Sequence, residues 1–276
     1  MRKQAETFQG INPFNFSIAY SETDSASKAN VHDNHIHKEC EIYVNVSGDV
    51  SFSVENSIYP ITTGSVIITR PYEYHHCIYH SDKVHKHFWI LFESSENENI
   101  LNIFFNRAPG KNNHLVLAPE KADELFSLCH KLTNGCKSDV EKYYLFFKLL
   151  NLLNDANAVN EQNIIKNSII SKSINYINEN LSERITIKKI AGICNVSVNT
   201  LERIFLKSLS ISPSEYIKKR RLANAAKLLS EGYNVTEASE ESGFHNCSNF
   251  ISVFKKYYNV TPLKYKKGVK PKDDSI

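Results

Sequence analysis

Polar and apolar residues alternate over short stretches in the first third of the chain, whereas later the apolar residues recur at helical spacing. The alternation runs from about Phe14 to Glu93, and turn-forming residues interrupt it at Ser47–Asp49, Glu55–Ser57 and Thr63–Gly64. A period of two is the spacing of strands with one buried face, and Gly, Asn and Ser mark the turns between them. Many short strands at close spacing predict a sandwich or a barrel.

Two stretches with helical periodicity follow, Pro119–Thr133 and Asp139–Leu153. Their apolar positions are Leu125, Leu128, Leu132, Tyr144, Phe147, Leu150 and Leu152. An Asn-rich stretch, Asn154–Asn163, has the composition of a linker, and helical segments continue beyond it to about Tyr265. We therefore predict a first domain over 1–156, a linker over 157–166, a helical domain over 167–268 and a tail over 269–276.

The helical domain contains the same pattern twice, at Ile185–Phe205 and at Val235–Phe254. Four positions recur at one offset, since 250 − 201, 254 − 205, 262 − 213 and 265 − 216 all equal 49. In each copy a short helix precedes a turn, at Asn195-Val196 and at Gly243-Phe244, and a small polar residue that can cap the next helix follows. A connecting helix over Pro213–Leu229 joins the copies, which predicts a duplicated helix-turn-helix unit.

The second helix of each copy has an outward face suited to DNA. Asn199 and Arg203 lie in the first two turns of the first such helix, and Asn pairs with adenine and Arg with guanine in a major groove. The complete set predicted to face DNA is Ser197, Val198, Asn199, Thr200, Glu202, Arg203, Lys207, Asn246, Cys247, Ser248, Asn249, Ser252, Lys255 and Lys256.

Charge is distributed unevenly along the chain. The net charge is +3, with 33 Lys+Arg and 30 Asp+Glu. Residues 167–276 carry 18 basic and 10 acidic residues, hence +8, and residues 1–166 carry the remaining 15 and 20, hence −5. This asymmetry favours a nucleic-acid partner for the helical domain only. Six scattered Cys have no zinc-finger spacing, and no signal peptide or membrane span is evident, so we expect a cytoplasmic protein with no membrane association.

Residues 168–267 resemble the DNA-binding domain of AraC/XylS-family transcription regulators. The resemblance is carried by Gly243-Phe244, Asn249-Phe250, Phe254–Lys256 and Thr261–Lys267. It implies that both recognition helices enter successive major-groove segments and that the base-reading positions are Asn199, Glu202, Arg203, Cys247, Ser248, Asn249 and Ser252. The chain departs from the family pattern at Ser210, Ser239, Ser252 and Asn259, so we expect the first copy to supply most base readout, with Lys255 and Lys256 of the second on phosphates.

His35, His37 and Glu41 share one face of a predicted strand, and Gly48 follows. This arrangement resembles the first motif of cupin barrels, and Gly64, Pro71 and His75-His76 partly resemble the second. The preferred interpretation is the polar lining of an effector pocket, with no cofactor. The predicted lining is His35, His37, Glu41, Tyr43, Arg70, Tyr74, His76 and Trp89. Two alternatives remain open: a divalent metal held by His35, His37, Glu41 and His76, and a purely structural strand.

Together these patterns predict a two-domain α+β protein, with an N-terminal cupin-like β-barrel and accessory helices before an all-α domain with two helix-turn-helix motifs. We expect a bacterial transcription regulator, not an enzyme, that binds double-stranded DNA and a small molecule. The family resemblance suggests a sugar effector, a homodimer formed through the later accessory helix, contact with RNA polymerase, and activation. The alternative is a cupin metalloenzyme or metallosensor with an accessory DNA-binding domain.

Overall fold

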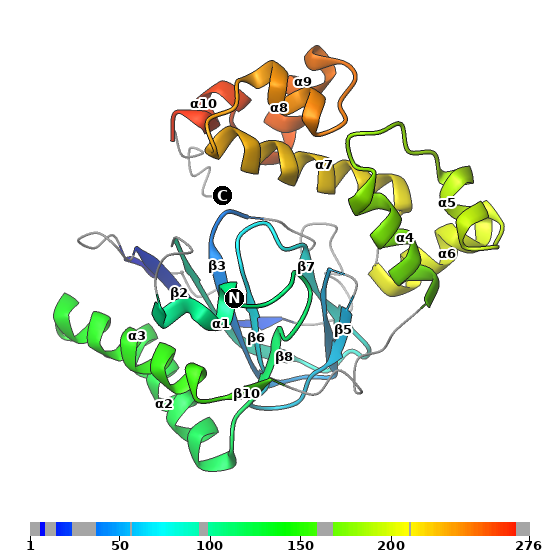
Figure 1. Ribbon diagram of the computed structural model, residues 1–276. Helices are drawn as coiled ribbons and strands as arrows, with labels where there is room; N and C mark the ends of the chain where they lie inside the picture. The colour runs from blue at the N-terminus through cyan, green and yellow to red at the C-terminus, as the bar shows by residue number, and fades with distance from the viewer. Residues whose placement is uncertain are drawn as a thin grey trace. The chain divides into compact units, whose positions relative to one another are not determined.

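The computed structural model describes residues 6–8, 15–23, 37–55, 57–93, 99–158, 168–209 and 211–268. The chain divides into two compact units, Met1–Lys166 and Asn167–Ile276 (Figure 1). Among the described residues, no helix combines the length and apolar character needed to cross a membrane.

The N-terminal unit consists of two antiparallel sheets. The large sheet has the strand order β1-β2-β8-β3-β6-β9-β10 and the small one β5-β4-β7. The strands are β1 (Glu6–Phe8), β2 (Phe16–Thr23), β3 (Cys40–Ser47), β4 (Val50–Val54), β5 (Ser57–Pro60), β6 (Val66–Thr69), β7 (His75–Tyr79), β8 (His85–Phe92), β9 (His114–Val116) and β10 (Asn157–Ala158). Residues 157 and 158, which the composition assigned to the linker, thus form an edge strand on β9.

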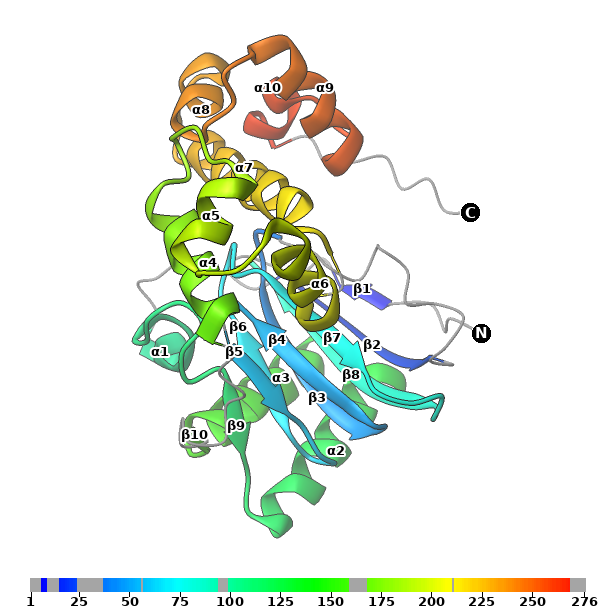
Figure 2. The same ribbon diagram turned by 90° about the vertical axis from the view of Figure 1, so that its right-hand side faces the viewer.

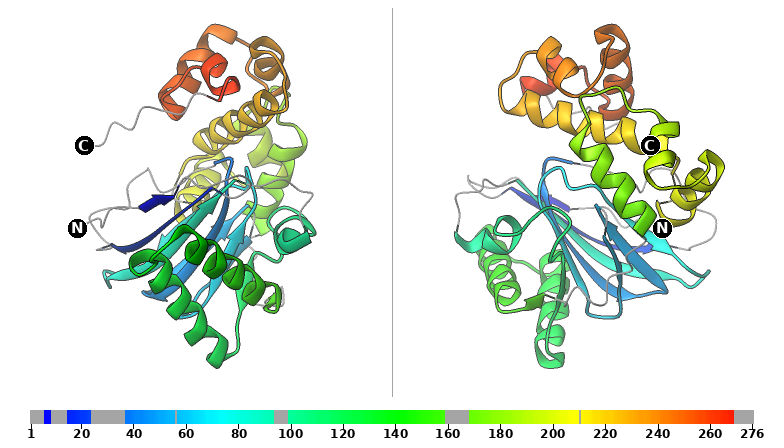
Figure 3. Two further views of the ribbon diagram at one scale, coloured as in Figure 1. Left: turned by 90° about the vertical axis from the view of Figure 1, so that its left-hand side faces the viewer. Right: turned by 45° about the vertical axis from the view of Figure 1, so that its right-hand side comes forward.

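Helices cover one face of the large sheet (Figure 3). They are the short turn η1 (Asn99–Leu101) with α1 (Asn102–Phe105), then α2 (Pro119–Asn134) and α3 (Asp139–Asn154). Ile42, Val44 and Ile90 point to this side and join the apolar faces of α2 and α3 in one core. Phe16 stacks on Phe146 of α3 with ring centroids 4.4 Å apart. The two predicted accessory helices therefore form, and each extends one residue beyond its predicted end.

The opposite face of the large sheet, which we call the inner face, packs against the small sheet. Because side chains alternate along β3, Tyr43 lies on this face between Ile42 and Val44. Tyr43 and Ile67 of the large sheet form a second apolar cluster with Phe52 and Tyr59 of the small sheet. A polar side chain placed on the inner face is consequently enclosed between the two sheets.

The C-terminal unit is helical throughout its described part. Its helices are α4 (Ser168–Glu179), α5 (Ile187–Ile193), α6 (Val198–Leu209), α7 (Pro213–Ser230), α8 (Val235–Glu241), α9 (Cys247–Tyr258) and α10 (Pro262–Lys266). Helices α4–α6 gather at one end of α7 and α8–α10 at the other (Figure 2). Tyr216 near the start of α7 contacts Phe205 of α6, and Asn224 farther along bonds to Ser242 after α8. One helix of 18 residues, about 27 Å long, thus joins the two helix-turn-helix units.

Candidate functional site

The recognition helices are α6 and α9, the second helix of each helix-turn-helix unit, and each begins at a side-chain cap. The Thr200 backbone N–H donates to Ser197 Oγ at 3.1 Å, and the Asn249 N–H donates to Asn246 Oδ1 at 2.8 Å. Caps of this kind satisfy the free N–H groups that start a helix. The turn before each cap passes through a left-handed residue, Asn195 at φ 54° and Gly243 at φ 80°. The local chemistry predicted from the sequence for both units is therefore confirmed.

The buried side of each recognition helix is the predicted one. Leu201 and Phe205 of α6 and Phe250 and Phe254 of α9 are fully buried. The side chains expected to face DNA lie on the other side. Exposed among them are Ser197, Asn199, Glu202, Arg203, Lys207, Asn246, Ser248, Asn249, Ser252, Lys255 and Lys256, while Val198, Thr200 and Cys247 are partly buried. Within the described residues no ion pair engages Arg203 or Lys207, so both remain available to an outside partner.

Not every basic residue of the C-terminal unit is available in this way. Arg221 of α7 donates to the backbone oxygens of Leu181 and Glu183, at 3.1 and 2.6 Å. Lys219 is 3% exposed, and burial lowers the pKa of its ammonium group. These two cations of α7 serve the unit's own packing rather than a surface patch.

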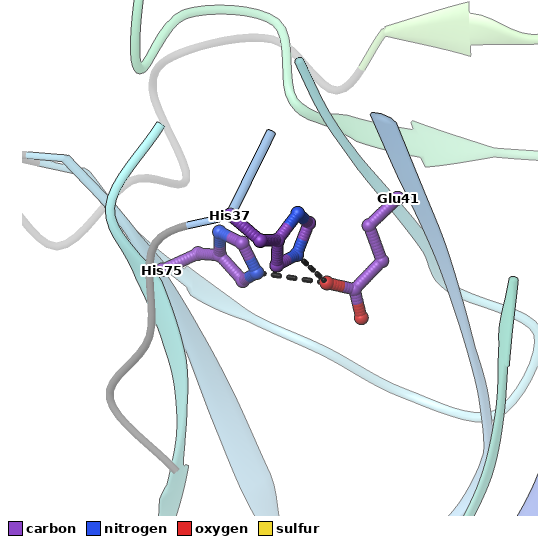
Figure 4. Close-up of side chains that lie close together, drawn as sticks. All are labelled: His37, Glu41 and His75. Atoms are coloured by element: carbon purple, nitrogen blue, oxygen red, sulfur yellow. Dashed lines mark hydrogen bonds and ion pairs between the residues drawn. The ribbon is translucent and has the colours of Figure 1, made fainter. Parts of the chain in front are cut away.

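On the inner face of the N-terminal unit, His37, Glu41 and His75 lie together (Figure 4). Glu41 Oε2 is 3.1 Å from His37 Nε2 and 2.8 Å from His75 Nε2. The side chains of Glu41 and His75 are 8% and 1% exposed, and that of His37 is 16% exposed. His35, predicted for the same site, lies outside the described residues.

The prediction of His76 for this cluster is wrong, and the register of β7 explains why. His75, Cys77 and Tyr79 stand opposite Val54, Phe52 and Val50, which belong to the inner cluster. Side chains alternate along a strand, so His76 points to the other face of the small sheet. His75 takes its place beside Glu41. Two adjacent His residues gave no basis in sequence for choosing between them.

Farther along the inner face, aromatic and imidazole rings surround Tyr43. The Tyr43 hydroxyl hydrogen-bonds to His85 Nε2, and its ring lies 4.8 Å from that of His87 and 4.5 Å from that of Phe52. Burial raises the pKa of Tyr43 well above its usual range. It lowers the pKa of His85 to about 4 and of His87 to about 3. These rings are therefore uncharged at neutral pH.

Asn45 was not predicted, yet it shows the clearest need for a partner. It is fully buried, and neither Nδ2 nor Oδ1 of its side-chain amide has a hydrogen-bond partner among the described residues. His87 stands directly opposite it on β8, and His87 Nδ1 is in the same condition. Buried polar atoms are normally paired, because leaving one unpaired costs about 1–3 kcal/mol. Only the strand register, not the sequence pattern, brings these two residues together.

The other predicted lining residues separate into two groups. Trp89 pairs with Tyr43 across β3 and β8, is partly exposed, and donates to Ser21 Oγ at 3.3 Å. Tyr74 is fully buried, and its backbone N–H donates to Glu55. Arg70 donates to the backbone oxygen of Arg107. Trp89 therefore shares the inner face with Tyr43, whereas Arg70 and Tyr74 belong to the connection between β6 and β7.

That connection carries a buried ion pair which sequence reasoning missed. Arg107 donates to both carboxylate oxygens of Glu73, at 2.8 and 2.6 Å, and the two side chains are 3% and 2% exposed. The Gly110 N–H and the Asn113 amide donate to the same carboxylate. Burial alone would raise the pKa of Glu73, but these bonds and the charge of Arg107 outweigh it and lower the pKa. The network ties the loop before β9 to the start of β7.

Comparison with known proteins assigns both units. The AraC-like ligand binding domain family matches residues 21–150, and the helix-turn-helix domain family matches residues 190–268. The chain belongs to the AraC family. It is an AraC-type DNA-binding transcriptional regulator with an N-terminal ligand-binding domain, and the family consists of regulators rather than enzymes. The predicted two-domain α+β fold class is confirmed.

Individual relatives align with this AraC-family chain over different lengths. The HTH-type transcriptional regulator YdeC of Bacillus subtilis is 34% identical over 108 residues, 39% of this chain and only 37% of that protein. The lactose operon transcription activator of Staphylococcus xylosus is 23% identical over 235 residues, 82% of each chain. A transcriptional regulator from Chromobacterium violaceum of known structure is 25% identical, with a TM-score of 0.35 over 37% of this chain and 92% of that one.

Proposed function

We propose that α6 and α9 read operator DNA, with most base contacts made by Asn199, Glu202 and Arg203 of α6. The observation that carries the proposal is the pair of capped helices with exposed polar faces, joined by the single helix α7. A span of about 27 Å approaches the 34 Å repeat of one DNA turn, which suits two helices on one side of a duplex. In α9, exposed Lys255 and Lys256 supply phosphate contacts.

Base reading and phosphate binding have different signatures. The operator is first selected from a random duplex library with the full-length protein, and binding is then measured for Arg203→Ala and Lys256→Ala. We expect Arg203→Ala to lose about 1–3 kcal/mol on the selected site and to relax preference at one base pair. Lys256→Ala should weaken binding to all sequences alike and reduce the slope of the logarithm of affinity against the logarithm of salt concentration by about one. Equal weakening of all duplexes by Arg203→Ala would assign that residue to phosphate instead.

We propose further that the effector is an uncharged polar molecule held on the inner face, with a sugar as the first candidate. The Asn45 amide and His87 Nδ1 supply hydrogen-bonding groups, and the ring of Trp89 supplies a stacking surface. His85 and His87 are neutral there because burial lowers the pKa of each. The Staphylococcus xylosus relative, a lactose operon activator, supports the choice of a sugar and of activation.

Trp89 is the only Trp of the chain and lies among these residues, so its fluorescence reports binding directly. Titration with a panel of neutral saccharides and of organic acids should change the emission for a saccharide, and Asn45→Ala should abolish that change. Asn151→Ala, at an exposed position on α3, is the control and should bind normally. A response to organic acids alone would overturn the uncharged class.

We propose that the regulator is a homodimer joined through α3 and that it acts by contact with RNA polymerase. Val140 and Tyr144, one helical turn apart, are 78% and 64% exposed, unusually high values for large apolar side chains. Effector binding would then shift the population of DNA-binding arrangements of the two subunits. Sedimentation should show a dimer that Tyr144→Glu converts to monomer, whereas Lys142→Glu on the same helix should remain dimeric.

A further inference from the structure

The cluster of His37, Glu41 and His75 holds three potential ligand atoms within 4.8 Å of one another. Glu41 lies on β3 and His75 on β7, whereas His37 lies in the segment before β3, which begins at Cys40 (Figure 4). His37 and Glu41 are neighbours in the sequence, and the pairing of the strands brings His75 to them. Within the described residues, no other group of three His, Cys, Asp or Glu side chains has this spacing.

The second nitrogen of each imidazole determines where the protons lie. His75 Nδ1 is 2.7 Å from the backbone oxygen of Glu73, and His37 Nδ1 is 3.0 Å from that of Glu39. A carbonyl oxygen can only accept, so each Nδ1 must be the donor and carry a proton. In a neutral imidazole the Nε2 atom then presents a lone pair.

In the neutral form, both Nε2 lone pairs would face Glu41 Oε2, at 3.1 and 2.8 Å. Lone pairs on a carboxylate and two imidazoles repel one another at such distances, and the repulsion is strong at a site shielded from water. A cation among the three atoms, whether a proton on an imidazole or a metal ion, converts the repulsion into attraction, and the convergence of all three atoms within 4.8 Å suits a shared metal ion. The backbone carbonyls that hold the Nδ1 protons are the outer partners that metal-binding histidines commonly have.

We propose that His37 Nε2, His75 Nε2 and Glu41 Oε2 bind a divalent transition-metal ion. Two imidazoles and one carboxylate suit Zn²⁺, Fe²⁺, Mn²⁺ or Ni²⁺, whereas Ca²⁺ and Mg²⁺ favour oxygen ligands. Three protein ligands leave further coordination positions for water or for an oxygen of a bound molecule. His37 is the most exposed of the three, so those positions open on its side. The proposal stands apart from the DNA-binding and saccharide proposals, neither of which requires a metal.

Metal binding is tested on the full-length protein without an affinity tag, stripped with EDTA and dialysed. Calorimetric titration with Zn²⁺ should give one equivalent per chain, and Glu41→Gln and His75→Gln should each weaken binding by about 100-fold or more. His76→Gln is the matched control, because His76 is the next residue on the same strand but points to the other sheet face. It should bind as the wild type does.

A second measurement avoids substitutions, in case Glu41→Gln does not fold. Co²⁺ added to the stripped wild-type protein should produce visible d–d absorption that one equivalent of Zn²⁺ abolishes. No binding of Zn²⁺ or Co²⁺ at micromolar concentration would overturn the proposal, and so would wild-type binding retained by both Glu41→Gln and His75→Gln. In the first case the cluster carries protons instead of a metal, and in the second the metal lies elsewhere.

Discussion

Replacing Arg107 by Met should destabilise the N-terminal unit more than any surface substitution would. The change keeps much of the aliphatic stem but removes both charge-assisted bonds to Glu73, and it leaves a carboxylate that is 2% exposed without its cation. Breaking a buried ion pair on one side costs about 3–5 kcal/mol, because the remaining charge stays buried. With a urea dependence of about 2 kcal/mol per molar, the midpoint should fall by about 2 M.

Urea unfolding followed by Trp89 fluorescence measures this loss, since the only Trp of the chain lies in β8 and reports on the N-terminal unit alone. The control is Lys121→Met. Lys121 and Asp155 form an ion pair at 3.4 Å with side chains 43% and 59% exposed, and its loss should cost at most about 1 kcal/mol. Similar losses for the two variants would refute the argument from burial.

The loss in Arg107→Met should also depend on pH. In the wild type the pKa of Glu73 is lowered, so its contribution to stability is present above the unfolded-state pKa and is lost as pH falls through the folded-state value. In the variant, burial without the guanidinium favours the protonated acid. The difference in unfolding free energy between variant and wild type should therefore be larger at pH 7 than at pH 5. A difference independent of pH would mean that packing, not charge, is responsible.

Substitutions at three further positions test other contacts. Gly243→Ala should lower the melting temperature of the C-terminal unit and weaken DNA binding. Gly243 has a φ of +80°, and an added Cβ would collide with the backbone oxygen of Leu181. An unchanged melting temperature would contradict this argument. Asn259 ends α9 at φ 57°, so Asn259→Ala should cost about 1 kcal/mol in thermal unfolding while Asn259→Gly should be nearly neutral. Burial lowers the pKa of His114 to about 4, so the unfolded state alone takes up this proton as pH falls from about 6.5. When the pH falls from 7 to 5, the unfolding free energy measured with urea should therefore decrease by about 1–2 kcal/mol less in His114→Gln than in the wild type. Parallel curves of unfolding free energy against pH for the two proteins would contradict this.

Local chemistry explains what could be predicted from the sequence. The predicted ranges of the accessory helices agree with α2 and α3 to within one residue, because apolar spacing acts within a few residues. In the structure Pro119 begins α2 and Ser138 caps α3. The caps at Ser197 and Asn246 depend on backbone groups three residues away. Such signals need no knowledge of how the chain returns on itself.

The rest depends on pairings between distant segments. Arg107 meets Glu73 across 34 residues, and Asn45 stands opposite His87 only through the register of β3 and β8. His75 and His76 are equivalent in the sequence until the pairing of β7 with β4 assigns each to one face. Strand register is set by the whole sheet, so composition and periodicity cannot choose between neighbours.

Divergence between the two helix-turn-helix copies supports unequal DNA contacts. In both copies the turn is closed by a backbone bond, Val196 N to Ala191 O and Phe244 N to Ser239 O, and the acceptors are 239 − 191 = 48 residues apart. The caps that follow are 246 − 197 = 49 apart, so the second turn contains one extra residue and α9 starts from a different point relative to α8.

The charge exposed on the first helix also differs between the two copies, and this difference likewise supports unequal DNA contacts. Helix α5 exposes Lys188 and Lys189, whereas α8 exposes Glu237, Glu240 and Glu241. The first helix of such a unit crosses the phosphate backbone, where Lys attracts and Glu repels the duplex. A duplex seated on α6 would therefore gain support from α5, while one approaching α9 would meet the acidic surface of α8 and depend on Lys255 and Lys256 to offset it. This difference in charge, together with the longer second turn, leads us to expect that the first copy determines the operator sequence.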